Sequence, residues 1–505
     1  MIVLCRKEAD VDIQYLIRRF DMAINDPRTY REIFKSESKD AYDQIDRIES
    51  IRFKAIAGSR DAEKYMIEKL CRFIYLFKDT EDIRIIDFDA PENNSEETRL
   101  ILLLETVELY DVLQIYCTDD IFDKDSLDKA VEGYREEIKQ RFSNIRERTE
   151  MLARIMFSNV YGLGIIDFLR GRFINEIGII RKDYIYIITR GRKIRIKAVA
   201  ISSNEALQNI LKKATLKANR PFDMANPITI SSRDNTDRVA VAGFAVTPDE
   251  NESYINIRIF NLESITLEEL RDKYNTLDAK MFDFLELNQK GKGSFFITGA
   301  DMNVGKSTML LAMLEKTPKA FGIGVIDPQN EMRLGVKYPD KNTITLISND
   351  LKTTDECFEY LLKTSRDVIS VSEITNSDEA TQLINGALRL NCGICATMHS
   401  LDPGEVLTNL RNLMMRTDMY TNEKAASDDI IRGIDLIIHL KRIKEKIVVE
   451  SIDELTPSGL CRLFSYENDD WKIRGIPSER YRRKLLSYLS EKDIEIYEEI
   501  FRGAV

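Results

Sequence analysis

The stretch Phe295-Phe296-Ile297-Thr298-Gly299-Ala300-Asp301-Met302-Asn303-Val304-Gly305-Lys306-Ser307-Thr308 decides the fold of the C-terminal half of the chain. Its apolar start predicts a buried strand, and the apolar residues that follow it predict a helix. The loop between them ends in Gly-Lys-Ser-Thr. A strand, such a loop and a helix form the context of a phosphate-binding loop, where backbone amides and a helix N-terminus hold an anion.

The loop predicts an ATP and Mg²⁺ site. Lys306 is expected to reach the β- and γ-phosphates, and the Ser307 hydroxyl is expected to bind the metal. The predicted nucleotide-binding residues of the loop are Gly299, Asn303, Val304, Gly305, Lys306, Ser307 and Thr308.

This loop contains less glycine than strong examples of the motif. Ala300 stands at the position of the first glycine, and Gly299 comes one residue too early. A carboxylate at Asp301 repels phosphates unless it points away. Because Val304 resists positive φ, Asn303 is the residue that adopts the left-handed conformation at lower energy.

Polar residues follow three further predicted strands of this half. Asp327 and Glu331 come after the strand at 324–326, Glu373 after the strand at 368–371, and His399 after the strand at 394–397. Open α/β sheets bind ligands at the carboxyl ends of their strands. A carboxylate such as Glu373 is suited to hold Mg²⁺ or to polarise a water molecule there.

The periodicity divides the chain into four regions. Residues 1–156 are predicted to be helical, with a linker at 90–97 and one long amphipathic helix over 126–160. Residues 157–275 are predicted to form a small α/β domain, with strands at 184–188, 193–199, 238–242 and 254–260, a turn at Arg190-Gly191 and a helix over 203–218. In residues 276–455 strands and helices alternate, which predicts an open α/β sheet with strands at 295–297, 324–326, 344–347, 368–371, 394–397 and 436–438. Residues 456–505 are predicted to be a helical tail.

Composition narrows the class of protein. The chain has 505 residues, 43% hydrophobic and 31% charged, which excludes wholesale disorder and predicts three or four domains. The net charge of -11 gives no general attraction to nucleic acid or anionic lipid. The start turns charged after five residues, and no run approaches the length of a membrane-spanning helix, so a cytoplasmic protein is expected.

Only Cys392 and Cys395, of the seven cysteines, have a spacing that suits a metal. With no second pair nearby, a small-residue buried strand is the favoured interpretation.

Taken together, these motifs resemble the secretion ATPases of type II and type IV systems, most closely the pilus-assembly ATPase of tight-adherence (Flp-type) systems. The likeness covers roughly residues 157–505. Besides the loop, it includes an acidic box (Asp327 and Glu331), an atypical Walker B glutamate (Glu373) and a His box (His399). The stretches Tyr161-Gly162-Leu163-Gly164, Asn175-Glu176-Ile177 and Ile257-Arg258-Ile259-Phe260 also resemble elements of that family.

The resemblance implies a RecA-like P-loop motor domain preceded by a small, PAS-like α/β domain. It implies Glu331 as the group that positions or activates water, with Glu373 supporting Mg²⁺ and that water. Arg258, and less directly Arg238, would bring positive charge to the phosphates from the small domain. His399 would sense the γ-phosphate, whereas His439 is expected to be a strand residue.

The resemblance further implies a homo-hexamer that couples ATP hydrolysis to domain motion in pilus assembly or protein secretion. Its partners would be an inner-membrane platform protein and, indirectly, pilins or secreted subunits, at the inner face of the cytoplasmic membrane. Three departures from the family pattern bear on hydrolysis: Ser372 replaces the glycine before Glu373, Thr375 replaces an arginine, and Lys363 and Ser365 stand where arginines are frequent.

Two alternatives stay open from the sequence. The glycine-poor loop is compatible with a nucleotide-binding scaffold subunit that hydrolyses ATP weakly or not at all. A nucleic-acid-translocating P-loop motor is the other alternative, although the acidic composition, with no evident basic, aromatic-rich stretch, counts against it.

Overall fold

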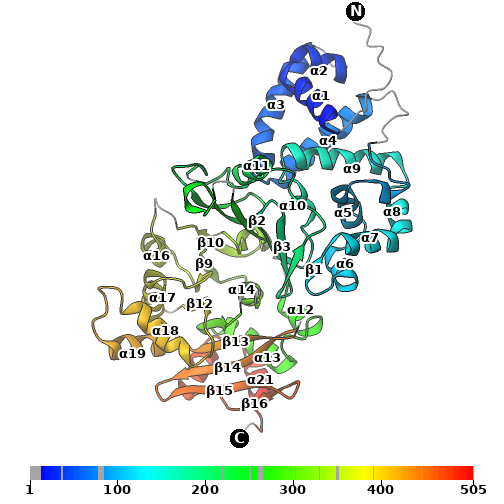
Figure 1. Ribbon diagram of the computed structural model, residues 1–505. Coiled ribbons are helices and arrows are strands. Elements are labelled where there is room, and N and C mark those ends of the chain that lie inside the picture. Colours follow the sequence, from blue (N-terminus) through cyan, green and yellow to red (C-terminus); the bar gives the residue numbers. More distant parts are fainter. Residues whose placement is uncertain are drawn as a thin grey trace, which may run out of the picture. The chain divides into compact units, whose positions relative to one another are not determined.

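The computed structural model describes residues 13–35, 38–77, 85–218, 220–249, 252–259, 265–301, 303–328, 330–348, 352–390, 392–444 and 446–503. The chain forms two compact units, Met1–Asn261 and Leu262–Val505. Each unit contains one β-sheet and its own hydrophobic core (Figure 1). The α/β fold class predicted from the sequence is confirmed.

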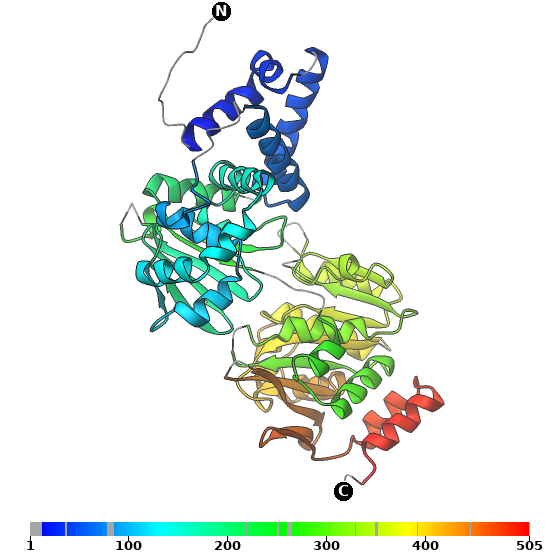
Figure 2. The ribbon, with the colours of Figure 1, turned by 90° about the vertical axis from the view of Figure 1, so that its right-hand side faces the viewer.

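The first unit begins with a bundle of four helices, which Figures 1 and 2 show in dark blue. They are α1 (Ile13–Asn25), α2 (Pro27–Phe34), α3 (Ser38–Ile56) and α4 (Arg60–Phe77). The Asp26 carboxylate caps α2 by accepting the Thr29 amide at 2.9 Å, and Pro27 occupies the first turn. The rings of Phe20 and Phe73 meet edge to face in the bundle core.

Five further helices follow: α5 (Glu96–Leu104), α6 (Leu109–Tyr116), α7 (Lys124–Gly133), α8 (Arg135–Arg141) and α9 (Ile145–Val160). The prediction of a single long helix over 126–160 is wrong, because three helices occupy this stretch. Gly133 ends α7, and a Cβ there would lie 2.2 Å from the Tyr116 hydroxyl. Asn144 starts α9 afresh by accepting the Glu147 amide at 3.0 Å.

The sheet of the first unit has the strand order β1-β4-β3-β2-β7-β6-β5. Its strands are β1 (Ile121–Phe122), β2 (Ile174–Arg181), β3 (Tyr184–Thr189), β4 (Arg192–Ile196), β5 (Ile228–Ser232), β6 (Arg238–Ala242) and β7 (Tyr254–Arg258). Isoleucines and valines alternate with polar residues, so one face of β3, β6 and β7 is buried. The helices α10 (Ile165–Phe168) and α11 (Asn204–Ala214) complete the unit.

The sheet of the second unit has nine strands in the order β10-β9-β11-β12-β8-β13-β14-β15-β16. The six strands from β10 to β13 run parallel, as expected when helices connect them. They are β8 (Phe295–Gly299), β9 (Gly322–Ile326), β10 (Asn342–Leu346), β11 (Val368–Val371), β12 (Gly393–His399) and β13 (Leu436–Ile443). All six strands predicted for this region are present.

Helices cover both faces of this sheet. One layer contains α12 (Leu267–Asp272), α13 (Ala279–Lys290), α14 (Lys306–Glu315), α20 (Glu479–Leu486) and α21 (Glu491–Ile500). The other contains α16 (Thr354–Leu362), α17 (Ser377–Arg389), α18 (Glu405–Met414) and α19 (Glu423–Gly433). The short helix α15 (Leu334–Lys337) follows β9.

The prediction of a helical tail over 456–505 is wrong for its first part. β14 (Lys446–Thr456), β15 (Gly459–Glu467) and β16 (Asp470–Ile473) extend the sheet by antiparallel pairing. The turn at Gly459, with φ of 112°, lets the chain reverse between β14 and β15. The rest of the tail contains helices as predicted, α20 and α21.

Cys392 and Cys395 are buried, and Cys395 lies within β12, which agrees with the strand interpretation. Burial raises the pKa of the Cys392 thiol to about 11 and that of Cys395 to about 12, so both stay protonated at neutral pH. Within the described ranges, none of the helices combines the length and the hydropathy that crossing a bilayer requires.

Candidate functional site

The predicted polar residues of the second unit meet along one edge of its sheet. Because β9, β11, β12 and β8 are neighbours and run parallel, their carboxyl ends lie side by side. Asp327 follows β9, Glu373 follows β11, and His399 ends β12. His399 pairs in register with Gly299, the last residue of β8, so the edge leads directly to the loop before α14.

The loop between β8 and α14 has the backbone conformation of an anion cradle. Asn303 and Gly305 have φ of 59° and 88°, and Gly305 caps the N-terminus of α14. Such left-handed residues turn successive amides towards one point. The left-handed conformation expected at Asn303 is therefore present, while Val304 is buried. Asp301 is exposed.

Gly299 takes part in the loop geometry although it precedes the usual position of the first glycine. A Cβ on Gly299 would lie 2.7 Å from Val304 Cγ1 and 2.9 Å from the Leu440 carbonyl oxygen. Only a residue without a side chain fits between the loop and β13 at this point. The shifted glycine thus permits the close packing that holds the loop.

Lys306, His399 and Glu373 are brought together by three different elements. Lys306 is 7% exposed, and its Nζ lies 3.2 Å from His399 Nε2 and 3.3 Å from His399 Nδ1. His399 Nε2 lies 3.3 Å from Glu373 Oε1. The side chains of His399 and Glu373 are 49% and 39% exposed, so this end of the group is open to solvent. A phosphate on the loop would compete with His399 for the Lys306 ammonium.

Asp327 is fully buried and holds the turn that carries Glu331. Its carboxylate accepts the Met332 amide at 2.7 Å, and its carbonyl oxygen accepts the Asn330 amide at 2.9 Å. Asn330 has φ of 52°. Glu331 is half-buried within this turn. The acidic box therefore combines a carboxylate inside the fold with one at its surface.

The hairpin of β13 and β14 forms a wall of the loop that the sequence reasoning missed. Arg442 on β13 donates from Nη2 to the Asn303 carbonyl oxygen at 2.8 Å. Ile447 on β14 lies near Gly305. The sequence signal was a basic pair, Lys441-Arg442, that continues the apolar strand at 436–438. In the sequence, Arg442 is recognisable only as a cation that follows a predicted strand.

His439 behaves as the strand residue that the sequence suggested. It is 3% exposed, and its Nδ1 lies 2.8 Å from Thr298 Oγ1 on the neighbouring strand β8. Burial lowers the pKa of His439, against the opposing effect of Glu450, whose Oε2 lies 3.7 Å from Nε2. A neutral imidazole joins β8 to β13 beneath the loop.

The segment after Glu373 is fixed by hydrogen bonds. The Thr397 hydroxyl donates to the Ser372 carbonyl oxygen at 2.6 Å, and the Ile374 amide donates to the Thr397 carbonyl oxygen at 2.8 Å. The buried Glu379 carboxylate accepts the Thr375 amide at 2.7 Å. Ser372 and Thr375, which depart from the family pattern, thus lie in an ordered connection that sets the direction of Glu373.

Arg238 and Arg258 lie opposite each other in the first unit. They are register partners on β6 and β7, so both side chains project from the same face of the sheet. Both are half-buried. Glu176, the partner of Arg258 on β2, directs its carboxylate to Tyr186 and Asn256, at 3.1 and 2.8 Å. Two guanidinium groups in this position favour an anion between or above them.

Comparison with solved structures gives matches to ATPases of secretion and pilus systems. The chain is 13% identical to the VirB11 ATPase of the Brucella suis type IV secretion system, with 64% of this chain and 95% of that one covered and a TM-score of 0.31. The chain is 16% identical to the Legionella pneumophila ATPase DotB, with 66% of this chain and 85% of that one covered and a TM-score of 0.43. It is 12% identical to the pilus retraction motor PilT with bound ADP, with 65% of this chain and 85% of that one covered and a TM-score of 0.39.

No protein-family model and no curated protein sequence matches the chain. These matches have identities of 12–16% and TM-scores below 0.5, so they assign no role to any residue of this chain.

Proposed function

We propose that this protein binds ATP with Mg²⁺ on the loop before α14 and hydrolyses it. One observation carries the proposal: a loop with left-handed residues at Asn303 and Gly305 delivers Lys306 to a point where His399 and Glu373 also converge. Lys306 is nearly buried, and a phosphate is a stronger partner for its charge than the His399 imidazole beside it.

The residues at the sheet edge fit the needs of phosphoryl transfer. Lys306 and the amides of Gly305, Ser307 and Thr308 would hold the phosphates, and the Ser307 hydroxyl and Glu373 would hold the metal ion and its water. The metal ion would neutralise the charge that develops on the phosphates. Glu331, at the surface of the Asp327 turn, would orient the attacking water.

His399 would report the state of the phosphates. Its ring contacts Lys306 on one side and Glu373 on the other, at 3.2 and 3.3 Å. When Lys306 turns to a phosphate, His399 would lose its contact with Lys306 and its position would change. A change at the end of β12 would then follow the presence of the γ-phosphate, which is how a motor couples hydrolysis to motion.

Arg258 and Arg238 extend the proposal to the first unit. Their positions as register partners on β6 and β7 support a role in stabilising phosphate charge during phosphoryl transfer. We propose that the chain works as a homo-hexamer whose two units move with the nucleotide cycle. Its work would be pilus assembly or protein secretion at the inner face of the cytoplasmic membrane, with a membrane platform protein and pilins or secreted subunits as partners.

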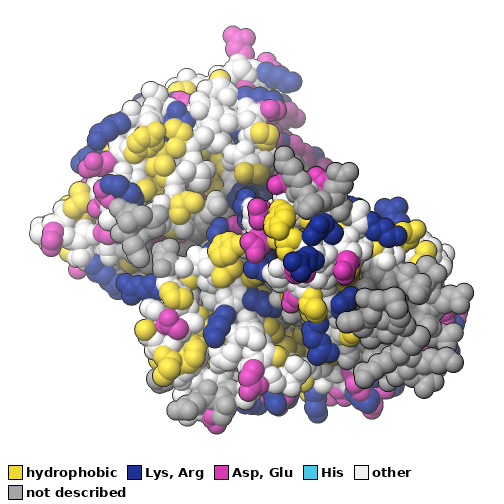
Figure 3. All heavy atoms as spheres, turned by 90° about the horizontal axis from the view of Figure 1, so that it is seen from above, with side chains coloured by type: hydrophobic (Ala, Val, Ile, Leu, Met, Phe, Trp, Pro, Cys, Tyr) yellow, Lys and Arg dark blue, Asp and Glu magenta, His cyan; other side chains and the backbone are white. Residues whose placement is uncertain are grey.

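A nucleotide-binding scaffold with weak turnover is the second candidate. Ala300 in the loop and Ser372 before Glu373 favour it, because glycines at these positions belong to the family pattern. A nucleic-acid motor receives less support: on the face drawn in Figure 3, basic side chains lie among acidic and hydrophobic ones.

Phosphate release from ATP by the purified protein separates these candidates. We expect Lys306→Ala to reduce the rate at least about 100-fold, the scale of losing an electrostatic partner of the transition state. Lys319→Ala is the matched control, since its side chain is 76% exposed beyond α14. Equal background rates in the wild type and Lys306→Ala would exclude the enzyme. Stimulation by DNA would favour the nucleic-acid motor.

A further inference from the structure

A second cluster of cations lies far along the chain from the phosphate-binding loop, within the bundle of α1–α4. A cavity of about 570 Å³ opens between α2, α3 and α4. The residues that line it are Tyr30, Phe34, Lys35, Asp40, Gln44, Arg47, Tyr65, Lys69 and Arg72. We call this set the bundle cavity.

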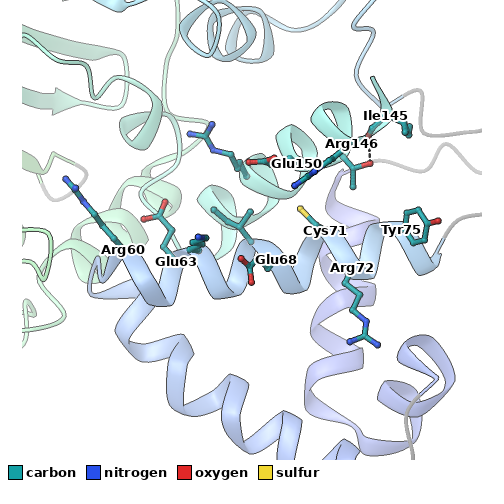
Figure 4. A pocket seen from close by; sticks show the side chains of 13 residues that line it. Arg60, Glu63, Glu68, Cys71, Arg72, Tyr75, Ile145, Arg146 and Glu150 are labelled. Carbon is teal, nitrogen blue, oxygen red and sulfur yellow. Dashed lines mark hydrogen bonds between the residues drawn. The ribbon is translucent and has the colours of Figure 1, made fainter. Parts of the chain in front are cut away.

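Helical spacing places the cations of the bundle cavity on shared helix faces. Tyr65, Lys69 and Arg72 recur at four and three residues on α4, so they share one face of that helix. Gln44 and Arg47 do the same on α3, which packs against α4. Figure 4 shows Arg72 extending from α4 on the side opposite Arg146; Arg72 also borders the wider groove between α4 and α9.

Like charges are held close together around one aromatic ring. Arg47 Cζ lies 5.2 Å and Lys69 Nζ lies 5.3 Å from the centre of the Tyr65 ring. Lys69 donates to Gln44 Oε1 at 2.7 Å, which is a neutral acceptor. Among the described residues, Lys35, Arg47, Lys69 and Arg72 have no ion-pair partner, and Asp40 is the single carboxylate of the lining.

Two further groups would gain from an anion in the cavity. Burial, together with the charges of Arg72 and Arg47, lowers the pKa of Lys69. The Tyr65 hydroxyl is buried and has no hydrogen-bond partner among the described residues. An anion that accepts from Lys69, Arg47 and this hydroxyl would relieve both the repulsion and the unsatisfied donor.

We propose that the bundle cavity is a binding site for an anionic phosphate group. Arginine, lysine and tyrosine donors around a polar cavity match the several acceptor oxygens of such a group. Two sources carry this chemistry: a soluble phosphate or diphosphate, and the headgroup of an anionic lipid. The site is independent of ATP hydrolysis and stands whether or not the phosphate-binding loop is active.

The test uses the full chain with Lys306→Ala as background, which removes phosphate binding at the loop. Equilibrium dialysis with labelled pyrophosphate measures the soluble source. Flotation with vesicles of phosphatidylcholine, with and without phosphatidylglycerol, measures the lipid source. Each is repeated for Lys69→Gln, Arg47→Gln and Asp40→Asn. Lys64→Gln is the matched control, because Lys64 lies on α4 but lines the groove towards α9.

We expect Lys69→Gln and Arg47→Gln each to weaken binding about tenfold in at least one of the two assays. Asp40→Asn should strengthen it, because a repelling carboxylate is lost, and Lys64→Gln should leave it unchanged. Lys69→Arg, which keeps the charge, should retain binding and guards against misfolding of the glutamine variant. Absence of binding in both assays, or equal loss in Lys64→Gln, would overturn the proposal.

Discussion

Arg442 is the residue whose role depends most on the folded structure. Its guanidinium reaches the Asn303 carbonyl oxygen at 2.8 Å, and Asn303 has the strained left-handed conformation that shapes the loop. Since Arg442 touches the loop backbone, it acts as a positioning residue.

We therefore predict that Arg442→Ala weakens nucleotide binding about tenfold. The KM for ATP should rise more than kcat falls, because Lys306 and Glu373 remain. Arg442→Lys should recover part of the affinity. The check is a titration with a fluorescent ATP analogue beside steady-state hydrolysis. A fall in kcat alone, with unchanged affinity, would assign Arg442 to the chemical step instead.

The sequence predicted the positions of several site residues, and their functional roles stay predictions. The structure brings these residues to one sheet edge, since His399 ends β12, Glu373 follows β11, and Gly305 and Lys306 begin α14. Arg442 was missed because its partner is a backbone carbonyl, which has no sequence signature. The inner role of Asp327 was missed likewise, since only the folded turn brings the Met332 amide to it.

At the scale of elements, helix α20 contacts the sheet through ion pairs with a buried carboxylate. The Asp435 carboxylate is fully buried, accepts the Ser294 amide at 2.8 Å, and accepts Lys484 Nζ at 2.6 Å. Arg480 on the same helix lies 3.4 Å from Asp435. The helix thus contacts the amino-terminal ends of β8 and β13, whereas the loop before α14 follows the carboxyl end of β8.

We predict that Asp435→Asn lowers the free energy of unfolding by about 3 kcal/mol, because it leaves Lys484 and Arg480 without their buried partner. Urea unfolding followed by circular dichroism measures this. Asp428→Asn, an exposed change on α19, should alter the unfolding free energy by less than about 0.5 kcal/mol. Equal effects of the two variants would contradict the docking role of Asp435.

Asp367 predicts a dependence of stability on pH. Burial raises the pKa of Asp367, but hydrogen bonds from Lys292 Nζ and the Gly322 amide outweigh it, so the pKa lies below its ordinary value of 3.8. A lowered folded pKa contributes stability above about pH 3.8. This contribution is lost as pH falls through the folded value.

The stability difference between the wild type and Asp367→Asn should accordingly be about 1 kcal/mol at neutral pH and shrink below pH 3.8. Unfolding free energies measured across this range test it, with the exposed Asp340→Asn as control. A difference that grows on acidification would show that the sign is wrong.

Helices and strands could be predicted where the hydrophobic pattern of the sequence is uninterrupted. Alternation gave β6 with its observed bounds, and short apolar runs gave the parallel strands of the second unit. The strands β14–β16 were missed because charged residues interrupt their apolar pattern, and in β14 two of these residues, Asp453 and Glu454, are buried. The end of α7 at Gly133 was missed, and the close approach of Gly133 to the Tyr116 hydroxyl is visible only in the folded structure.

At the scale of the whole molecule, the chain has two compact units with separate cores. The loop before α14 belongs to the second unit, whereas Arg258 and Arg238 belong to the first. Binding and hydrolysis should therefore be separable by mutation if the first unit supplies charge to the phosphates.

We predict that Arg258→Ala reduces ATP turnover at least about tenfold and changes the affinity for ADP by less than about twofold. Arg181→Ala, on the same sheet at the exposed end of β2, is the matched control. Loss of turnover and of ADP affinity to the same extent would place Arg258 in general nucleotide binding or in folding.

Calorimetric titration of the protein with a non-hydrolysable ATP analogue in the presence of Mg²⁺ tests the proposed nucleotide site. We predict saturable binding to the wild type, a loss of affinity of at least about 100-fold in Lys306→Ala, and unchanged affinity in Lys319→Ala. Equal affinity of the wild type and Lys306→Ala, or no binding by either, would contradict a nucleotide site on the loop before α14.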